Sequence, residues 1–170
     1  MSRPVGLDET GDFTTWYAGA APGVLLTLRA ALGDDQLAEE AVAEAFTRAY
    51  SRWSKVRAME SRTGWVYVVA LNHARTLARR SRHESPTADP REPGGGASAG
   101  PEPVDPLWSA VRELSAAART AIALRYIADL PEAEVARLIG VSRGTVATTL
   151  HRARRALADR LRVDQPEGLQ

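Results

Sequence analysis

The chain has 170 residues, of which 44% are hydrophobic and 25% charged, the composition of a globular protein that can bury a core. Its 22 basic and 21 acidic residues nearly balance, so a nucleic-acid signal can lie only in how the charges are distributed. There is no cysteine, which excludes disulfides and thiolate metal or redox sites, and no apolar run fits a membrane span or a signal peptide, so we expect a cytoplasmic protein.

Three helical stretches are predicted in the first half of the chain. The first runs from Asp12 to Leu32 and is interrupted near Pro22, because proline breaks the hydrogen-bond ladder of a helix. The second, Asp35 to Trp53, carries a nearly unbroken apolar stripe at helical spacing. The third covers about Thr63 to Arg82. Trp53 and Trp65 lie on apolar stripes, so we interpret both as packing residues.

The segment from His83 to Asp105 separates two parts of the chain. Pro, Gly, Ser and Ala crowd together there and the apolar periodicity is lost, which predicts a flexible linker over residues 83–105. Neither half has the alternating apolar pattern of strands. The sequence therefore predicts an all-α fold with two small helical domains, residues 12–82 and 106–162.

The second half begins with recognisable capping residues. Asp105 and Pro106 are predicted as the N-cap and first residue of one helix, and Ser115 as the N-cap of the next. Pro131 begins a further short helix that ends at Gly140. A last helix follows, with Ser142 as its N-cap, and two short helices joined by a glycine-containing turn form a helix-turn-helix.

The last helix has two faces. Val146, Leu150, Ala153, Leu157 and Leu161 recur at the spacing of a buried stripe. A second stripe, roughly 200° around the helix, is expected to face outward and comprises Thr148, His151, Arg152, Arg155 and Asp159. Arginines dominate the charges of this segment. An arginine-rich helix alone is most often a solvated face, but the preceding helix, the turn and the small residues at its start favour a helix that enters a DNA groove.

Three segments, in this order and spacing, resemble the extracytoplasmic-function sigma factors of bacterial RNA polymerase: LAEEAVAEAFTRAYSRW, RTGWVYVVALNHARTLARR and LPEAEVARLIGVSRGTVATTLHRARRAL. The resemblance covers both helical domains. It implies that the first domain, region 2, binds the polymerase clamp and melts the −10 element, and that the second, region 4, binds the β flap and reads the −35 element. It implies three partners, core RNA polymerase, promoter DNA and an anti-sigma factor, with no cofactor and no small-molecule substrate.

The resemblance also implies three groups of site residues. Those offered to the β′ clamp helices are Glu40, Glu44 and Arg48. A loop, Ser54 to Gly64, cradles a flipped −10 base, and the helix after it contacts the strand through Tyr67, Asn72, Arg75 and Arg79. The −35 residues are Arg143, Thr145, Thr148, His151, Arg152 and Arg155, whose hydroxyl, imidazole and guanidinium groups suit base edges and phosphates. We expect Thr148 and His151 to specify the sequence, and Arg152 and Arg155 to anchor the backbone.

Three other kinds of protein remain as alternatives. The main one is a stand-alone helix-turn-helix regulator, whose first half dimerises or senses a signal and which binds closed duplex at paired half-sites without polymerase. The second is a helical protein that docks only other proteins. An enzyme is the weakest, because there is no Gly-rich phosphate loop or metal-ligand spacing and the three histidines lie far apart in the sequence. Binding to core polymerase separates the first alternative from a sigma factor.

Overall fold

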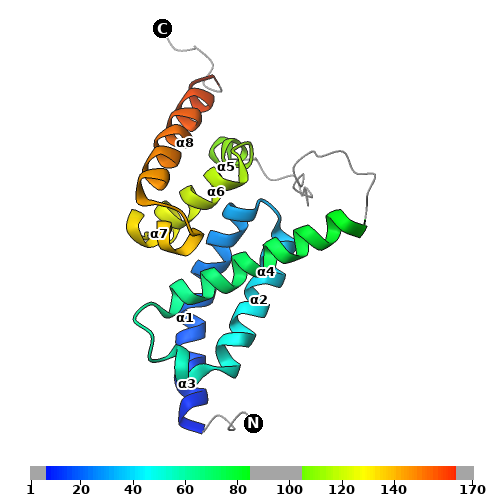
Figure 1. Ribbon diagram of the computed structural model, residues 1–170, viewed down its shortest axis with the longest axis vertical. Coiled ribbons are helices and arrows are strands. Elements are labelled where there is room, and N and C mark those ends of the chain that lie inside the picture. Colours follow the sequence, from blue (N-terminus) through cyan, green and yellow to red (C-terminus); the bar gives the residue numbers. More distant parts are fainter. Residues whose placement is uncertain (1–6, 85–104, 164–170) are drawn as a thin grey trace.

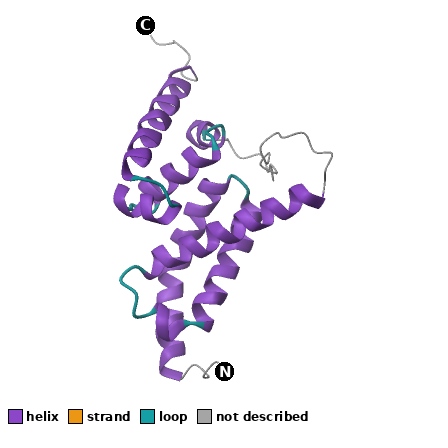
Figure 2. Ribbon diagram, in the orientation of Figure 1, coloured by secondary structure: helices purple, strands orange, loops and turns teal. Residues whose placement is uncertain are grey.

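The computed structural model describes residues 7–84 and 105–163 (Figure 1). All regular structure within these two ranges is helical (Figure 2), which confirms the all-α prediction. No helix in this part of the chain combines the length and apolar character that crossing a membrane requires. Most of the predicted linker lies outside the described residues. The elements are α1 (Leu7–Leu32), α2 (Asp35–Ser51), α3 (Trp53–Val56), α4 (Arg62–Glu84), α5 (Pro106–Arg112), α6 (Ala116–Ile122), the π-helical turn η1 (Ala123–Ile127), α7 (Glu132–Ile139) and α8 (Arg143–Val163).

Helices α1, α2 and α4 pack side by side in the N-terminal domain (Figure 1). The Asp34 side chain caps α2 by accepting a hydrogen bond from the backbone N–H of Leu37 at 2.9 Å. The predicted apolar stripe of α2 is buried against its neighbours and includes Ala38, Ala41, Val42, Ala45, Phe46 and Ala49. This stripe fixes which face of α2 remains in solvent.

The predicted break in the first helix is wrong. Helix α1 continues through Pro22 and begins at Leu7, earlier than expected. Pro22 lies on the exposed side of the helix, so its ring projects into solvent, while Val24 and Leu28 on the opposite side are buried. Packing of that buried side therefore outweighs the single backbone hydrogen bond that proline removes.

An aromatic cluster closes the far end of the N-terminal domain. Helix α2 ends at Ser51, slightly before its predicted end, and Trp53 begins the short helix α3. The Trp53 side chain is buried, and its ring stacks on that of Trp16 with 5.0 Å between the centroids. The prediction that Trp53 is a packing residue is therefore confirmed.

The predicted caps of the C-terminal domain are confirmed. Asp105 accepts a hydrogen bond from the N–H of Leu107 at 2.9 Å, and Ser115 accepts one from the N–H of Ala118 at 3.3 Å. Helix α7 begins at Glu132, directly after Pro131. One element was not predicted. Helix α6 continues into the π-helical turn η1, where the helix is wider than an α-helix, before the helix-turn-helix begins.

The two domains pack against each other. Helix α1 contacts α6 and η1, α4 contacts α7, and one continuous cluster of buried apolar side chains extends through both domains. Ala30 and Ala31 of α1 meet Ala123 of η1 in a smaller cluster of their own. The side chain of Arg119, on α6, is buried at this boundary. Helices from the two halves of the sequence therefore share an extensive interface.

Candidate nucleic-acid and polymerase-binding surfaces

The turn between α7 and α8 is built by backbone geometry at two residues. Gly140 has a φ of 74°, the left-handed region that glycine adopts at low cost, and its N–H and that of Val141 both donate to the carbonyl oxygen of Ala136 at 3.0 Å. The Ser142 hydroxyl then accepts a hydrogen bond from the N–H of Thr145 at 3.0 Å. These contacts end α7, begin α8 and hold the first turn of α8 in a defined position.

The two predicted faces of α8 are present. Val146, Leu150, Ala153 and Leu157 are buried, and Leu161 is half-buried. The predicted outward stripe is exposed along its whole length: Thr148, His151, Arg152, Arg155 and Asp159. Helix α8 therefore presents a polar, mostly basic face to solvent beside the turn of a helix-turn-helix.

The charges on α8 differ in their pairing. Arg160 pairs with Glu113 at 2.8 Å, and Arg143 lies 4.0 Å from Glu132. Arg152 and Arg155 form no ion pair with any residue of the described part of the chain. Their guanidinium groups are therefore available to an external anion such as a DNA phosphate.

Thr145, predicted as a DNA contact, already has a partner at the start of α8. Its hydroxyl lies 2.8 Å from the Ser142 hydroxyl, and both side chains are exposed. A hydroxyl can donate one hydrogen bond and accept others, so this contact leaves Thr145 able to meet a phosphate or base. It also orients the Thr145 side chain.

The predicted −10 residues on α4 divide into two groups. Asn72, Arg75 and Arg79 are exposed on one side of the helix, and Arg75 Nη1 donates to Asn72 Oδ1 at 3.3 Å. Tyr67 faces the other way, toward α1, and only 3% of it is exposed. This placement corrects the expectation for Tyr67: its position on the helix turns the ring into the core, where it is not available to a base.

Tyr67 is held in the core by a hydrogen bond. Its hydroxyl donates to Thr27 Oγ1 at 3.2 Å, while the Thr27 hydroxyl donates to the carbonyl oxygen of Gly23 at 2.8 Å. Burial raises the pKa of Tyr67 above its usual value of 10, and the hydrogen bond with Thr27 opposes this only in part. Tyr67 is a structural link between α4 and α1.

The loop before α4 has exposed basic residues around a capped helix start. Lys55 and Arg57 are exposed, whereas Val56 and Trp53 anchor the segment in the core. The Ser61 hydroxyl accepts a hydrogen bond from the N–H of Gly64 at 3.2 Å, which caps α4. The predicted base-capture loop is thus fixed at both ends and open to solvent between them.

The predicted polymerase-binding residues lie on the solvent face of α2. Glu44 and Arg48 form the expected i,i+4 pair, with 2.6 Å between Oε1 and Nε. The Glu40 side chain is 58% exposed and lies 3.6 Å from Nε2 of His73 on α4. The three side chains form a mixed-charge surface, defined here as the α2 face: Glu40, Glu44 and Arg48.

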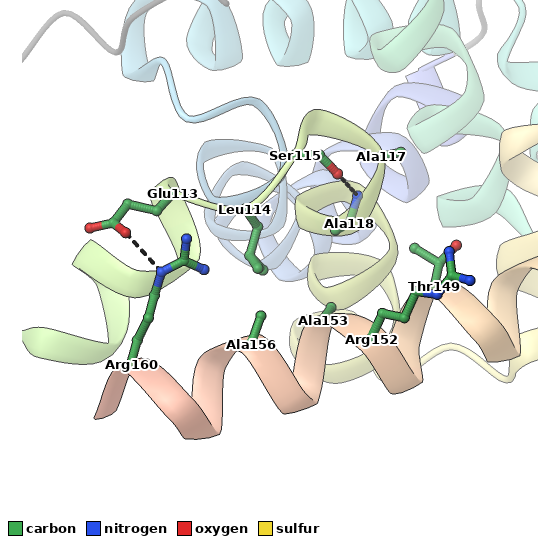
Figure 3. A pocket seen from close by; sticks show the side chains of 10 residues that line it. All are labelled: Glu113, Leu114, Ser115, Ala117, Ala118, Thr149, Arg152, Ala153, Ala156 and Arg160. Atoms are coloured by element: carbon green, nitrogen blue, oxygen red, sulfur yellow. Dashed lines mark hydrogen bonds and ion pairs between the residues drawn. The ribbon is translucent and has the colours of Figure 1, made fainter. Parts of the chain in front are cut away.

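A surface pocket that was not predicted lies between the α5–α6 segment and α8. It has a volume of about 390 Å³, and Leu114, Ala118, Ala153 and Ala156 supply its apolar side chains (Figure 3). The Arg160–Glu113 ion pair closes one end. Its residues come from the α5–α6 turn, from α6 and from α8, so no local sequence pattern identifies it. Across residues 7–84 and 105–163, no three of His, Asp and Glu gather as a metal site requires.

Comparison with known proteins gives a match to a family in the C-terminal domain. Residues 105–157 match the family described as Sigma-70, region 4. The chain is also 27% identical over 158 residues to the RNA polymerase sigma-E factor of Streptomyces coelicolor, a match that covers 91% of this chain and 89% of the relative. These matches confirm the resemblance to extracytoplasmic-function sigma factors.

Two solved structures share the fold. One is the sigma factor RpoE in complex with the anti-sigma factor NepR from Bartonella quintana, with a TM-score of 0.75 and 21% identity over 91% of this chain and 99% of that one. The other is CnrH in complex with the cytosolic domain of CnrY, with a TM-score of 0.62 and 18% identity over 92% and 91%. The arrangement of two helical domains is common to all three chains.

Proposed function

We propose that this protein is an extracytoplasmic-function sigma factor, which binds core RNA polymerase and directs it to promoters with particular −10 and −35 elements. One observation carries the proposal: the segment that matches sigma region 4 folds as a helix-turn-helix whose last helix exposes two arginines, Arg152 and Arg155, that form no ion pair with the described residues. A helix of this kind enters the major groove with its N-terminal end. As a specificity subunit, the protein performs no chemistry of its own.

In the proposed division of labour, region 4 comprises residues 106–162 and reads the −35 element. Thr148 and His151 lie nearer the N-terminus of α8, where a groove-entering helix meets base edges, so we assign them to sequence recognition. Arg152 and Arg155, which lack acidic partners in the described chain, bind phosphates. Arg143 and Thr145, exposed at the start of the helix, supply further contacts.

Region 2, residues 12–82, engages the −10 element in this proposal. The exposed side chains of Asn72, Arg75 and Arg79 form a polar and basic strip along α4, directly after the loop that would hold an extruded base. Such a strip suits the backbone and bases of a single strand. Tyr67 is not part of this surface. Residues 83–105 link the two regions.

We propose the α2 face as the contact with the β′ clamp helices and region 4 as the contact with the β flap. Both structural relatives are bound to an anti-sigma factor or to the cytosolic domain of a partner protein. We therefore propose that an anti-sigma factor also holds this chain. Since RNA polymerase acts on the chromosome, the protein works in the cytoplasm.

Run-off transcription with purified core RNA polymerase tests the function. The template is a pool of genomic promoters from the source organism, and the reaction is run with and without the protein. We expect protein-dependent transcripts whose promoters share −35 and −10 sequences. The Arg152→Ala/Arg155→Ala double variant should lose most of these transcripts. The function is refuted if no transcript depends on the protein while it binds duplex DNA without core polymerase, the behaviour of a stand-alone regulator.

A further inference from the structure

A carboxylate of the C-terminal domain is seated on the start of helix α4. The Ser61 hydroxyl donates a hydrogen bond to Oε1 of Glu134, on α7, at 2.8 Å. The two residues are 73 positions apart in the sequence. This contact joins the helix-turn-helix of one domain to the base-capture loop of the other.

The contact leaves no room for a side chain at position 64. A Cβ atom at position 64 would lie 3.1 Å from Oε1 of Glu134 and 2.4 Å from the Ser61 hydroxyl oxygen, so glycine leaves room for both. Gly64 is buried, and the Glu134 side chain is only 21% exposed. The other polar partner of Glu134 is Arg137 on its own helix, at 3.5 Å. The carboxylate is thus directed at α4.

The surroundings of the contact attract anions. The first turn of the 23-residue helix α4 has backbone N–H groups without carbonyl partners in the helix, and the helix dipole adds a partial positive charge there. Arg62 lies in this turn with its guanidinium over the Trp53 ring, and exposed Lys55 and Arg57 precede it, with Arg57 3.7 Å from the Asp12 carboxylate. In the free chain the anion bound at this helix start is the Glu134 carboxylate. A phosphate has acceptor oxygens of the same kind.

We propose that Glu134 stands in for a backbone phosphate of the −10 strand, so that docking of α7 on α4 and binding of that strand exclude each other. The inference rests on the proposed function, since it takes α4 and its loop as the −10 site. In the free chain the docked α7 weakens binding of single-stranded DNA. The promoter strand displaces Glu134 when the domains separate.

The expected size of the effect follows from the strength of one hydrogen bond. Because the Glu134 carboxylate is partly accessible to solvent, its removal should raise strand affinity only about three- to tenfold. The packing of α1 on α6 and η1 persists in such a variant. The domains therefore remain associated for part of the time, which limits the gain.

The test is fluorescence anisotropy of the full chain with a labelled single-stranded oligonucleotide that carries the −10 sequence found by run-off transcription. The variant is Glu134→Ala. The matched control is Glu132→Ala, which removes the same charge from the same helix but from a side chain that faces Arg143 at 4.0 Å. We expect about three- to tenfold tighter binding for Glu134→Ala and no more than the small general gain from lost negative charge for Glu132→Ala. Equal affinities in the two variants would overturn the proposal.

A second measurement needs no change at the contact. The chain has no cysteine, so dyes can be attached at Ala18→Cys on α1 and Ala158→Cys on α8, both at exposed positions. Saturating −10 oligonucleotide should lower energy transfer between the dyes, because the strand separates the domains. Unchanged energy transfer on full binding would show that strand and docked α7 coexist, and the proposal would be wrong.

Different results would refute the proposed function and the displacement of Glu134. If core polymerase with this protein yields no protein-dependent transcripts, the proposed function fails. If transcripts appear but Glu134→Ala and Glu132→Ala bind the oligonucleotide equally, only the displacement of Glu134 is refuted.

Discussion

Arg119 reaches across the domain boundary to Leu32: Nη2 of its guanidinium lies 3.5 Å from the Leu32 carbonyl oxygen, at the C-terminus of α1. Nη1 donates to the carbonyl oxygens of Arg112 and Leu114, at 3.0 and 2.9 Å, where α5 ends. Only 5% of Arg119 is exposed, and its hydrogen-bond partners among the described residues are all backbone carbonyls. One buried cation thus serves the ends of two helices from different domains, where carbonyl groups lack partners in their own helix.

Replacement of Arg119 should destabilise the fold. In Arg119→Ala the carbonyl groups of Arg112 and Leu114 lose their donors in a buried setting, so we expect the free energy of unfolding to fall by about 2 to 4 kcal/mol. Urea denaturation followed by circular dichroism measures it. Arg112→Ala, which removes an exposed arginine nearby, is the control and should change stability by less than about 0.5 kcal/mol. Similar values for both variants would contradict the role given to Arg119.

Two glycines beside the helix-turn-helix should respond in opposite ways to alanine. Gly140 has a positive φ and open space around it, so Gly140→Ala meets backbone strain alone and should cost about 1 to 2 kcal/mol. Gly144 lies in the first turn of α8 without a positive φ, so Gly144→Ala should stabilise the helix by about 0.5 to 1 kcal/mol. Thermal unfolding of the two variants measures both changes, a loss of stability for Gly140→Ala and a gain for Gly144→Ala.

If the start of α8 approaches the DNA backbone as proposed, the same Gly144→Ala variant should bind −35 duplex more weakly, because the added methyl group would lie between the helix and the DNA. A more stable variant with unchanged duplex affinity would place the DNA away from this end of α8. Duplex titration at fixed salt measures the affinity.

The raised pKa of Tyr67 predicts a loss of stability in alkali. The neutral phenol is favoured in the folded state, so its contribution is complete below pH 10, the usual value of the unfolded chain, and is lost as pH rises through the higher folded pKa. In Tyr67→Phe this loss should be absent. At neutral pH the variant should cost only about 0.5 to 1 kcal/mol, since the Thr27 hydroxyl keeps its bond to Gly23. Melting temperatures of both proteins from pH 8 to pH 11 test this. If the melting temperatures of the two proteins fell in parallel as pH rises, the raised pKa of Tyr67 would be contradicted.

Salt dependence should separate the arginines of α8. If Arg152 and Arg155 each neutralise a phosphate, replacement of either by alanine should reduce the slope of log affinity against log salt by about 0.9. Arg160→Ala is the matched control, because Arg160 already pairs with Glu113 at 2.8 Å. Its slope should equal that of the parent protein. An unchanged slope in Arg152→Ala would exclude the phosphate contact for that residue.

Charge reversal on the α2 face should weaken binding to core polymerase. If the α2 face is the contact with core polymerase, Glu40→Arg with Glu44→Arg should lower the affinity by about tenfold or more, because a surface complementary to carboxylates would then meet cations. Gln36→Arg, at another exposed position of α2, controls for added positive charge. Competition with labelled parent protein for core polymerase measures the affinities. Full affinity in the reversed variant would remove the α2 face from the interface.

Local sequence signals predicted much of the helical architecture. The caps at Asp105, Ser115 and Ser142 and the two faces of α8 depend on neighbours within one or two turns, and these are as expected. The break predicted at Pro22 was wrong. Proline removes one hydrogen bond within its own helix, whereas the packing that keeps α1 continuous comes from other helices. The resemblance placed Tyr67 on the DNA side, but its position on α4 turns it toward Thr27 of α1.

The interface between the domains could not be predicted from the sequence. In the sequence, Arg119 has no feature that distinguishes it from a surface arginine. No residue near Ser61 or Glu134 in the sequence indicates that these two side chains meet. Such contacts join residues tens of positions apart and leave no periodic pattern. The boundaries of the two domains and the assignment of the site residues to DNA and polymerase stay predictions.

The chemistry of the Arg119 contact also determines how the packed domains tolerate a changing cell interior. A guanidinium keeps its charge throughout the physiological range, and a peptide carbonyl neither gains nor loses a proton there. Because no carboxylate takes part, this joint should hold almost equally well in acid stress, in alkaline stress and at the ionic strengths of osmotic shock. Opening at this joint would then depend on binding partners and not on pH or ionic strength.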